Sequence, residues 1–391
     1  MSELLESRWV DTKTALLEGL QGTKKAVMET TLENTRRYLS ESATAGATSA
    51  GNVATLNRVI LPVIRRVMPT VIANELVGVQ PMTGPVGQIH TLRVRYADAF
   101  NSANGTDTSA GEEALSPFKI AEGYSGATDD KAATTAALEG NAGRKLSIQI
   151  LKQTVEAKSR KLSARWTFEA AQDAQSMHGI DVEAEIMAAL AQEITAEIDQ
   201  EVLASLNSLA GNAAETYDQA AVSGTATFVG DEHAALAVQI NRVANLIAQR
   251  TRRGAGNWAV VSPFALTILQ SATTSAFART TEGTFEAPTN TKMVGTLNNA
   301  MKVYVNTYSS DNADVLVGYK GASESDAPAF YCPYIPLMSS GVVLDPSTFE
   351  PTVSFMTRYG YVELSNTASS LGNAADYLGN VAITNGNVSF S

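Results

Sequence analysis

Residues 97–143 are too poor in apolar side chains to form a core of their own. They are rich in alanine, glycine, serine, threonine and aspartate, and they interrupt a chain of 391 residues that otherwise shows regular patterns. A loop of this length is uncommon inside a compact domain unless it has a function or is disordered. We therefore expect an extended loop over residues 97–143, which contacts outside its own domain would have to order.

A long helix is predicted at residues 181–209. Apolar residues recur every four positions along one side of it: Ile186, Leu190, Ile194, Ile198, Val202 and Leu206. Acidic residues at its start suit the positive end of the helix dipole. Glu193, Glu197 and Glu201 form an acidic stripe on another side, which is either a solvated face or a face that meets arginines of a neighbouring subunit.

Helix and strand patterns elsewhere predict an α+β fold. Residues 42–51 are a small-residue linker, and residues 232–345 alternate between helix and strand, which is typical of a separate α/β unit. Near the end of the chain, Asn385-Gly386 lies between two short apolar runs and predicts a hairpin.

The composition limits the kind of protein this can be. The formal net charge is -11, whereas a protein that holds nucleic acid by its phosphates needs a dense basic face. Only 18% of the residues are charged, compared with about 25% in typical domains, which favours a surface that faces other protein. No signal peptide or membrane span is visible, so we expect a soluble protein made in the cytoplasm, with no membrane partner.

Residues that could perform catalysis or hold a metal do not cluster in the sequence. The three histidines, His90, His178 and His233, lie on separate segments without the spacing of metal ligands. The chain has no nucleophile elbow, phosphate-binding loop or dinucleotide fingerprint. Its single cysteine, Cys332, lies among aromatic residues with no base beside it, which is typical of a buried thiol. We predict a protein that is not an enzyme and takes no cofactor or metal.

Four blocks of sequence resemble one protein family. The first, residues 62–96, reads PVIRRVMPTVIANELVGVQPMTGPVGQIHTLRVRY. The second spans residues 155–186, the third is GNWAVVSP at 256–263, and the fourth combines residues 317–337 with DPSTFEPTVSFMTRYG at 345–360. In this order, over about 300 residues, the blocks resemble the major capsid proteins of T-even-like contractile-tailed bacteriophages.

The resemblance implies the Hong Kong 97 capsid fold, in which an extended loop reaches over a neighbouring subunit. The expected parts, in chain order, are an N-terminal helical segment that is an arm or a cleavable propeptide (1–41), an N-arm with the start of the peripheral domain (42–96), the extended loop (97–143), the peripheral domain with its spine helix at 181–209 (144–231), the axial domain (232–345), a return strand of the peripheral domain (346–370) and the C-terminal hairpin (371–391).

The resemblance also implies a function. The chain would be a structural major capsid protein that self-assembles into hexamers, and into pentamers if the same chain forms them, around the double-stranded DNA of a phage head. Implied partners are further copies of the chain, the portal, and decoration, scaffold or protease proteins; the DNA is enclosed without sequence-specific binding. The location would be the virion capsid, after assembly in the cytoplasm of the bacterial host. Three alternatives stay open: an encapsulin-like compartment shell, a vertex paralogue that forms only pentamers and, least favoured, an enzyme.

Charged side chains are the candidates for contacts between subunits. The basic candidates come from the first block and from the turn after the helix at 234–249: Arg65, Arg66, Arg93, Arg95, Arg250, Arg252 and Arg253. Glu193, Glu197 and Glu201 are the predicted acidic partners. For the turn, a solvated loop is the alternative.

Maturation of the resembled family adds one candidate site. A protease of these phages cleaves after a glutamate that is preceded two residues back by leucine or isoleucine. The sequence LSES at residues 39–42 fits this pattern, with cleavage between Glu41 and Ser42, and LLE at 4–6 and at 16–18 fits as well. The alternative is an intact helical arm that packs inside the shell.

Overall fold

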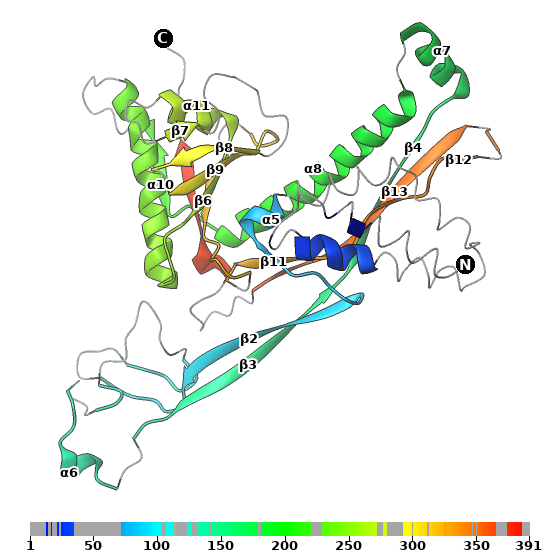
Figure 1. The fold of residues 1–391 in the computed structure, drawn as a ribbon. Helices are drawn as coiled ribbons and strands as arrows, with labels where there is room; N and C mark the ends of the chain where they lie inside the picture. The colour runs from blue at the N-terminus through cyan, green and yellow to red at the C-terminus, as the bar shows by residue number, and fades with distance from the viewer. Residues whose placement is uncertain are drawn as a thin grey trace. The chain divides into compact units, whose positions relative to one another are not determined.

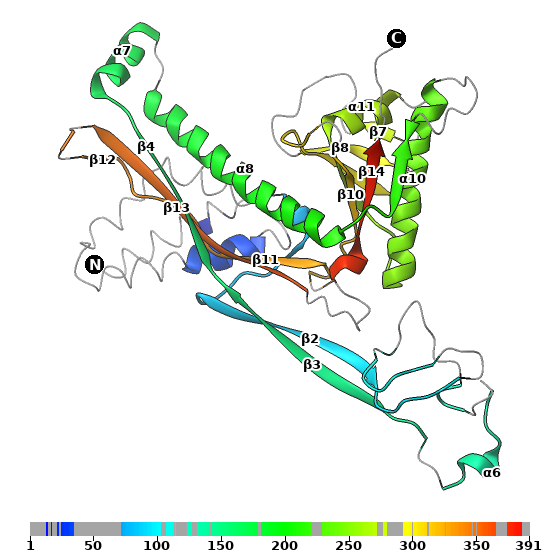
Figure 2. The same cartoon turned by 180° about the vertical axis from the view of Figure 1, so that it is seen from behind.

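A computed structural model gives the fold of the chain (Figures 1 and 2). It describes residues 13–14, 17, 22, 25–34, 72–102, 107–112, 114, 123–126, 131–140, 143–178, 181–219, 229–271, 277–279, 292–298, 300–310, 313–324, 326–345, 347–348, 350–364 and 374–384. The chain divides into two units. Unit 1 comprises Met1–Gly87, Val155–Ala204 and Phe330–Val362, and unit 2 comprises Gln88–Thr154, Ser205–Ala329 and Glu363–Ser391. Both combine helices with strands, which confirms the predicted α+β class.

Unit 1 is built on a five-stranded sheet. Its strands are β1 (Gly78–Val79), β4 (Lys158–Arg165), β11 (Ala329–Ser339), β12 (Val343–Leu344) and β13 (Pro351–Glu363). β1 pairs in parallel with β11, β11 lies beside β13, and β4 and β12 pair antiparallel with β13. Two short helices, α5 (Ala73–Leu76) and α7 (Phe168–His178), lie at the ends of these strands in the chain.

The helix predicted at residues 181–209 is α8, Val182–Ala210. Asp181 caps its start, because the Oδ1 atom accepts hydrogen bonds from the N–H groups of Glu183 (3.1 Å) and Ala184 (3.4 Å). The predicted apolar side is buried, with Ile194, Ile198 and Val202 no more than 1% exposed. A rise of about 1.5 Å per residue gives this helix of 29 residues a length of about 43 Å.

The strands on either side of the predicted loop form a two-stranded ribbon. They are β2 (Val86–Tyr96) and β3 (Leu146–Glu156). The N–H of Ala157 donates to the carbonyl of Pro85 (2.9 Å) at one end, and the N–H of Ala97 donates to the carbonyl of Lys145 (3.0 Å) at the other. The strands therefore run antiparallel, and because both bonds join residues with the same sum of numbers, the register is constant along the ribbon.

The described part of the loop 97–143 has a small core of its own. The rings of Phe100 and Tyr124 meet edge to face at 6.3 Å, and both residues are buried. The guanidinium of Arg144 lies 4.0 Å from the centre of the Phe100 ring and donates to three carbonyls within residues 123–126 at 2.7 to 3.3 Å. We expected contacts outside the domain to order this loop; these residues instead order one another around one arginine.

Unit 2 contains a seven-stranded sheet in the order β5-β14-β10-β6-β9-β8-β7. The strands are β5 (Glu215–Asp218), β6 (Trp258–Val261), β7 (Phe277–Arg279), β8 (Lys292–Leu297), β9 (Met301–Val305), β10 (Val315–Gly318) and β14 (Leu378–Thr384). The helices of this unit are α6 (Thr135–Leu138), α10 (Val229–Thr251), α11 (Pro263–Ser271) and the 3-10 turn η1 (Ala374–Tyr377).

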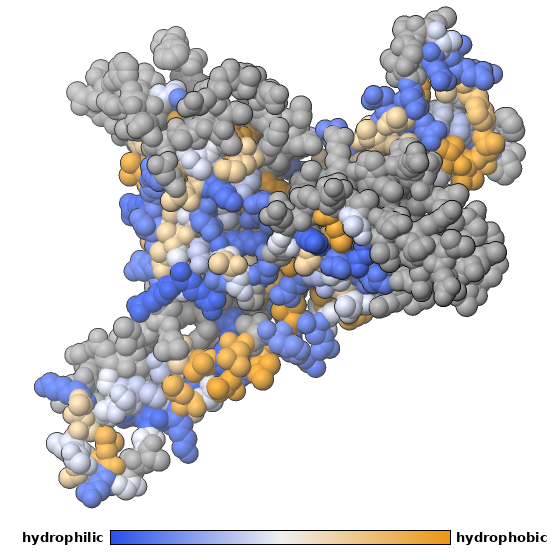
Figure 3. Space-filling view, viewed as in Figure 1, coloured by the Kyte–Doolittle hydropathy of each residue, from blue (hydrophilic) through white to orange (hydrophobic). Residues whose placement is uncertain are grey.

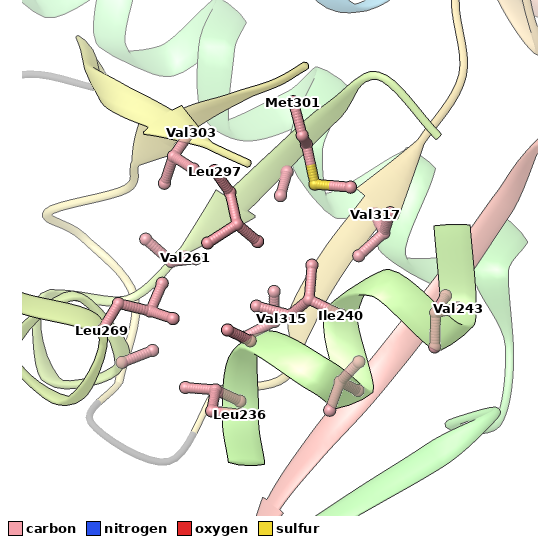
Figure 4. Close-up of a cluster of buried hydrophobic side chains, with 14 of the residues drawn as sticks. Leu236, Ile240, Val243, Val261, Leu269, Leu297, Met301, Val303, Val315 and Val317 are labelled. Atoms are coloured by element: carbon pink, nitrogen blue, oxygen red, sulfur yellow. The ribbon is translucent and has the colours of Figure 1, made fainter. Parts of the chain in front are cut away.

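The core of unit 2 lies between this sheet and the helices α10 and α11 (Figure 4). Leu236 and Ile240 of α10 and Leu269 of α11 are at most 2% exposed and meet valines of the central strands, among them Val315 and Val317. These strands are short and almost fully apolar, as expected for strands buried on both faces.

Two predicted boundaries differ from the structure. The sheet of the predicted axial domain (232–345) also contains β5 and β14, whereas β11 pairs with strands of unit 1. The first strand of the predicted C-terminal hairpin (371–391) is β14. Both edges of β14 are already paired, one with β10 and the other with β5, so β14 has no free edge for a hairpin partner. The second strand of that hairpin lies outside the described residues. Turn signals report only local pairing, and here the pairing is long-range.

Candidate assembly surfaces

The ribbon carries a strip of apolar side chains that face solvent. The constant register places Leu92 opposite Ile150 and Val94 opposite Ile148, so these side chains share one face with Leu146. Leu92, Ile148 and Ile150 are 64%, 68% and 66% exposed. Figure 3 shows this strip as an orange patch over β2 and β3. Isolated two-stranded ribbons are marginally stable, and contiguous exposed apolar surface marks a site of interaction. We call these five residues the apolar strip.

Two predicted contact residues lie on the opposite face of the ribbon. Arg93 and Arg95 alternate with Leu92 and Val94 along β2, so their side chains point away from the apolar strip. Arg93 is only 4% exposed, which contradicts its predicted place on a charged contact surface. Arg95 is half-buried, and within the described part of the chain its Nε is buried without a hydrogen-bond acceptor. Arg95 therefore stays a candidate for an acidic partner.

The acidic stripe of α8 binds an arginine of its own chain. Arg160 on β4 donates through Nη1 to Glu197 (2.6 Å), through Nη2 to Glu201, and through Nε to the hydroxyl of Tyr359 (2.6 Å), which in turn donates to Glu201. Burial alone would raise the pKa of Glu201, but these hydrogen bonds and the charge of Arg160 hold that pKa below its usual value. An intrachain arginine thus takes the place predicted for arginines of a neighbouring subunit. Glu193 is exposed and stays a candidate.

The basic turn after α10 is also bound within the chain at one of its arginines. Arg252 adopts a φ of 49°, the left-handed conformation that commonly ends a helix. The next residue, Arg253, places its Nη1 2.6 Å from Oδ1 of Asp326, and the hydroxyl of Tyr377 donates to the same oxygen at 3.3 Å. The Arg253 side chain keeps 58% exposure, so this pair is a surface pair. Arg252 is exposed and Arg250 half-buried, and both stay candidates.

Four predicted site residues, Arg65, Arg66, Glu41 and Ser42, lie outside the described residues. Intersubunit ion pairs for the two arginines and cleavage of the Glu41–Ser42 bond therefore stay predictions.

The sequence patterns did not single out a buried carboxyl group on α8. Asp199 is 3% exposed, and its Oδ1 accepts a hydrogen bond from the N–H of Ile72 at 2.8 Å, where α5 begins. Burial raises the pKa of Asp199 to about 7, although the hydrogen bond from Ile72 lowers it in part. Only its position beside the buried Ile198 distinguishes Asp199 from the exposed acidic residues of the same helix.

In the described ranges, three features are relevant to chemistry beyond packing: clusters of metal-ligating side chains, the single thiol and long apolar helices. No group of three or more histidine, cysteine, aspartate and glutamate side chains there could hold a metal ion. Cys332 is 2% exposed, and burial raises the pKa of its thiol to about 11, so the thiol is protonated at neutral pH. None of the described helices combines the length and the apolar composition needed to cross a bilayer.

The chain is similar to one family of known proteins. The family described as "Major capsid protein Gp23" matches residues 53–383. The major capsid protein of Vibrio phage KVP40 is 30% identical over 81% of this chain and 77% of its own length. The major capsid protein of Enterobacteria phage T4 is 29% identical over 83% and 78%. Among solved structures, the capsid of Myoviridae phage XM1 aligns with a TM-score of 0.43 at 9% identity, over 80% of this chain and 92% of that one.

Proposed function

We propose that this chain, which belongs to the Gp23 family of major capsid proteins, assembles into hexamers that tile an icosahedral shell around double-stranded DNA. Membership of this family makes the chain a structural component of a phage head and not an enzyme. The long helix α8, the ribbon and the separate α/β unit support the proposal, because they match the spine helix, the extended loop and the axial domain that the family resemblance implies. The proposal includes pentamers of the same chain, contacts with portal, scaffold, decoration and protease proteins, and assembly in the cytoplasm of a bacterial host.

The apolar strip is the observation that carries this proposal. Burying one aliphatic side chain of this size contributes about 1.5–3 kcal/mol relative to leaving it in water. A second copy of the chain is the natural partner, since most assemblies of one protein are symmetric and repeat the same contact in every subunit. Repeated modest contacts stabilise a closed shell, while a single misplaced copy can still dissociate.

A charge placed within the strip tests the proposal. Ile148→Glu puts a carboxylate where the second copy would bury an apolar side chain, and we expect it to stop particle formation and leave a folded subunit. Gln149→Glu adds the same charge at the next residue, which is exposed on the other face of β3, and should assemble normally. Negative-stain electron microscopy and sedimentation read the assembly, and circular dichroism reads the fold. Normal particles from Ile148→Glu would refute the role of the strip.

The acidic composition supports a shell that contains DNA without neutralising it. With a net charge of -11, the chain leaves most of the phosphate charge of packaged DNA to cations. Purified particles should contain nuclease-protected double-stranded DNA. Particles that hold protein and no DNA would favour an encapsulin-like compartment instead.

A further inference from the structure

A groove opens on the face of the unit 1 sheet that points away from α8. Arg160 of β4 binds the acidic stripe of α8, so Lys161, the next residue of the strand, points to the other side of the sheet. The register pairs Lys161 with Met356 and Ser163 with Ser354, which places these four side chains on that face. Together with the end of β11 they line a groove of about 460 Å³, within the range of about 300–1,000 Å³ that is typical of binding sites.

The groove carries positive charge that its own strands do not balance. The sequences of β4 and β11 contain no aspartate or glutamate, and the acidic residue of β13, Glu363, is the last of that strand. Lys161 is exposed, and within the described residues it forms no ion pair. Arg165, further along the same face, lies beside Glu350 and still keeps 73% exposure. An acidic partner would complement this face.

The helix α7 is exposed on nearly all sides. Among its side chains that the structure describes, that of Ala171 is half-buried and the others are exposed. Trp166 and Thr167 alone join α7 to β4, and Figures 1 and 2 show the helix beyond the end of that strand. A helix of 11 residues is marginal in water without packing against another surface. A surface that covers α7 would therefore stabilise it.

The exposed side chains of α7 also carry negative charge. Residues 166–241, which include this helix, contain no lysine or arginine. Glu169 and Asp173 are exposed and lie one turn apart on one side of α7. Ala170, on the same side, is exposed as well, and its small side chain permits a close approach. This side of the helix has the charge that the groove lacks.

We propose that α7 of one copy of the chain binds in the groove of a second copy, with the carboxylates of Glu169 and Asp173 facing Lys161. The inference deepens the proposed assembly function and rests on it. Every copy has both halves of the contact, and the halves are different surfaces, so each copy binds one neighbour through its helix and another through its groove. Head-to-tail contacts of this kind close into rings when the rotation between copies allows it, as the proposed hexamers require.

Reversing the charge on either half should prevent assembly. Lys161→Glu makes the groove as acidic as α7, and Glu169→Lys with Asp173→Lys makes α7 as basic as the groove. We expect each variant to fold and to assemble at least about tenfold more slowly than the wild type, because like charges then meet in every contact. Gln175→Lys adds a positive charge on the opposite side of α7 and should assemble normally. Circular dichroism reads the fold and light scattering the rate. Wild-type rates from both reversed variants would overturn the proposal.

A mixture of the two reversed variants shows whether the contact joins different copies. In a ring that alternates them, each acidic groove meets a basic α7 and each basic groove meets an acidic α7. We therefore expect six-membered rings in electron micrographs of the mixture, although neither variant forms them alone. Damage within one chain would not be repaired by mixing, so a mixture as inactive as its components would overturn the proposal.

A disulfide separates this contact from the proposed function as a whole. Ser163→Cys in one chain and Ala170→Cys in another place one thiol on each half of the contact, while Cys332 is buried. Oxidation of the mixture should give a covalent dimer on a non-reducing gel, because the two thiols come within bonding distance only if α7 lies in the groove. Absence of this dimer would overturn the contact. A wild-type chain that never forms shells would refute the proposed function instead, and the dimer would still report the contact.

Discussion

At the scale of single residues, the carboxyl group of Asp199 makes the free energy of unfolding depend on pH. Its pKa of about 7 in the folded chain lies above the value of about 3.9 expected in the unfolded chain. Between these two pH values the folded chain binds more protons than the unfolded one. The free energy of unfolding therefore falls as pH rises through this window, and above about pH 7 the cost of the buried charge is fully present.

Asp199→Asn removes this charge and keeps an oxygen that can accept the N–H of Ile72. We expect the variant to be more stable than the wild type at about pH 8, by at most about 4 kcal/mol, because each pKa unit corresponds to about 1.4 kcal/mol. The difference should largely disappear below about pH 3, where the carboxyl is mostly protonated in both the folded and the unfolded wild type. Urea unfolding at the two pH values measures it. The same difference at both pH values would show that the charge is not the cause.

At the scale of elements, the tip of the ribbon depends on the planar guanidinium of Arg144. It stacks over Phe100 and donates to several carbonyls at once, which a lysine ammonium cannot do in the same geometry. Arg144→Lys keeps the charge, and we expect it to expose the described residues of the loop 97–143 to proteolysis while α8 and the sheet of unit 2 stay protected. Lys145→Arg, at the exposed neighbouring position, should behave like the wild type. An equally resistant Arg144→Lys loop would refute the role of this arginine.

At the scale of the whole molecule, the paired arginines of the first sequence block are predicted to act between subunits. Arg65→Glu combined with Arg66→Glu should stop assembly and leave a folded subunit, because the variant repels any acidic partner on the next copy. Lys24→Glu with Lys25→Glu changes the net charge equally but lies outside the segment that matches the family, and should still form particles. Electron microscopy of both variants shows whether particles form. Normal particles from the arginine variant would contradict the prediction.

The elements with strong periodicity could be predicted from the sequence, and the partners of the strands could not. The helix at 181–209 was predicted almost to its observed ends, because its apolar repeat and its acidic start are local signals. The place of β14 between β5 and β10 had no such signal, since the strands that it joins are far apart in the chain. Gly318 is a similar case: a side chain there would collide with the indole of Trp258, which only the folded sheet brings beside it.

The sequence by itself determined the fold class, the long helix and, through four blocks of residues, the family. The tertiary structure alone decided which charges are already paired. Glu197 and Glu201 looked available to a neighbouring subunit, but Arg160, 37 and 41 positions away, binds both. The physical reason is that periodicity shows which side of a helix faces water, whereas an ion pair depends on which strand packs beside that side. Here the pairing of β4 with β13 brings Arg160 to α8.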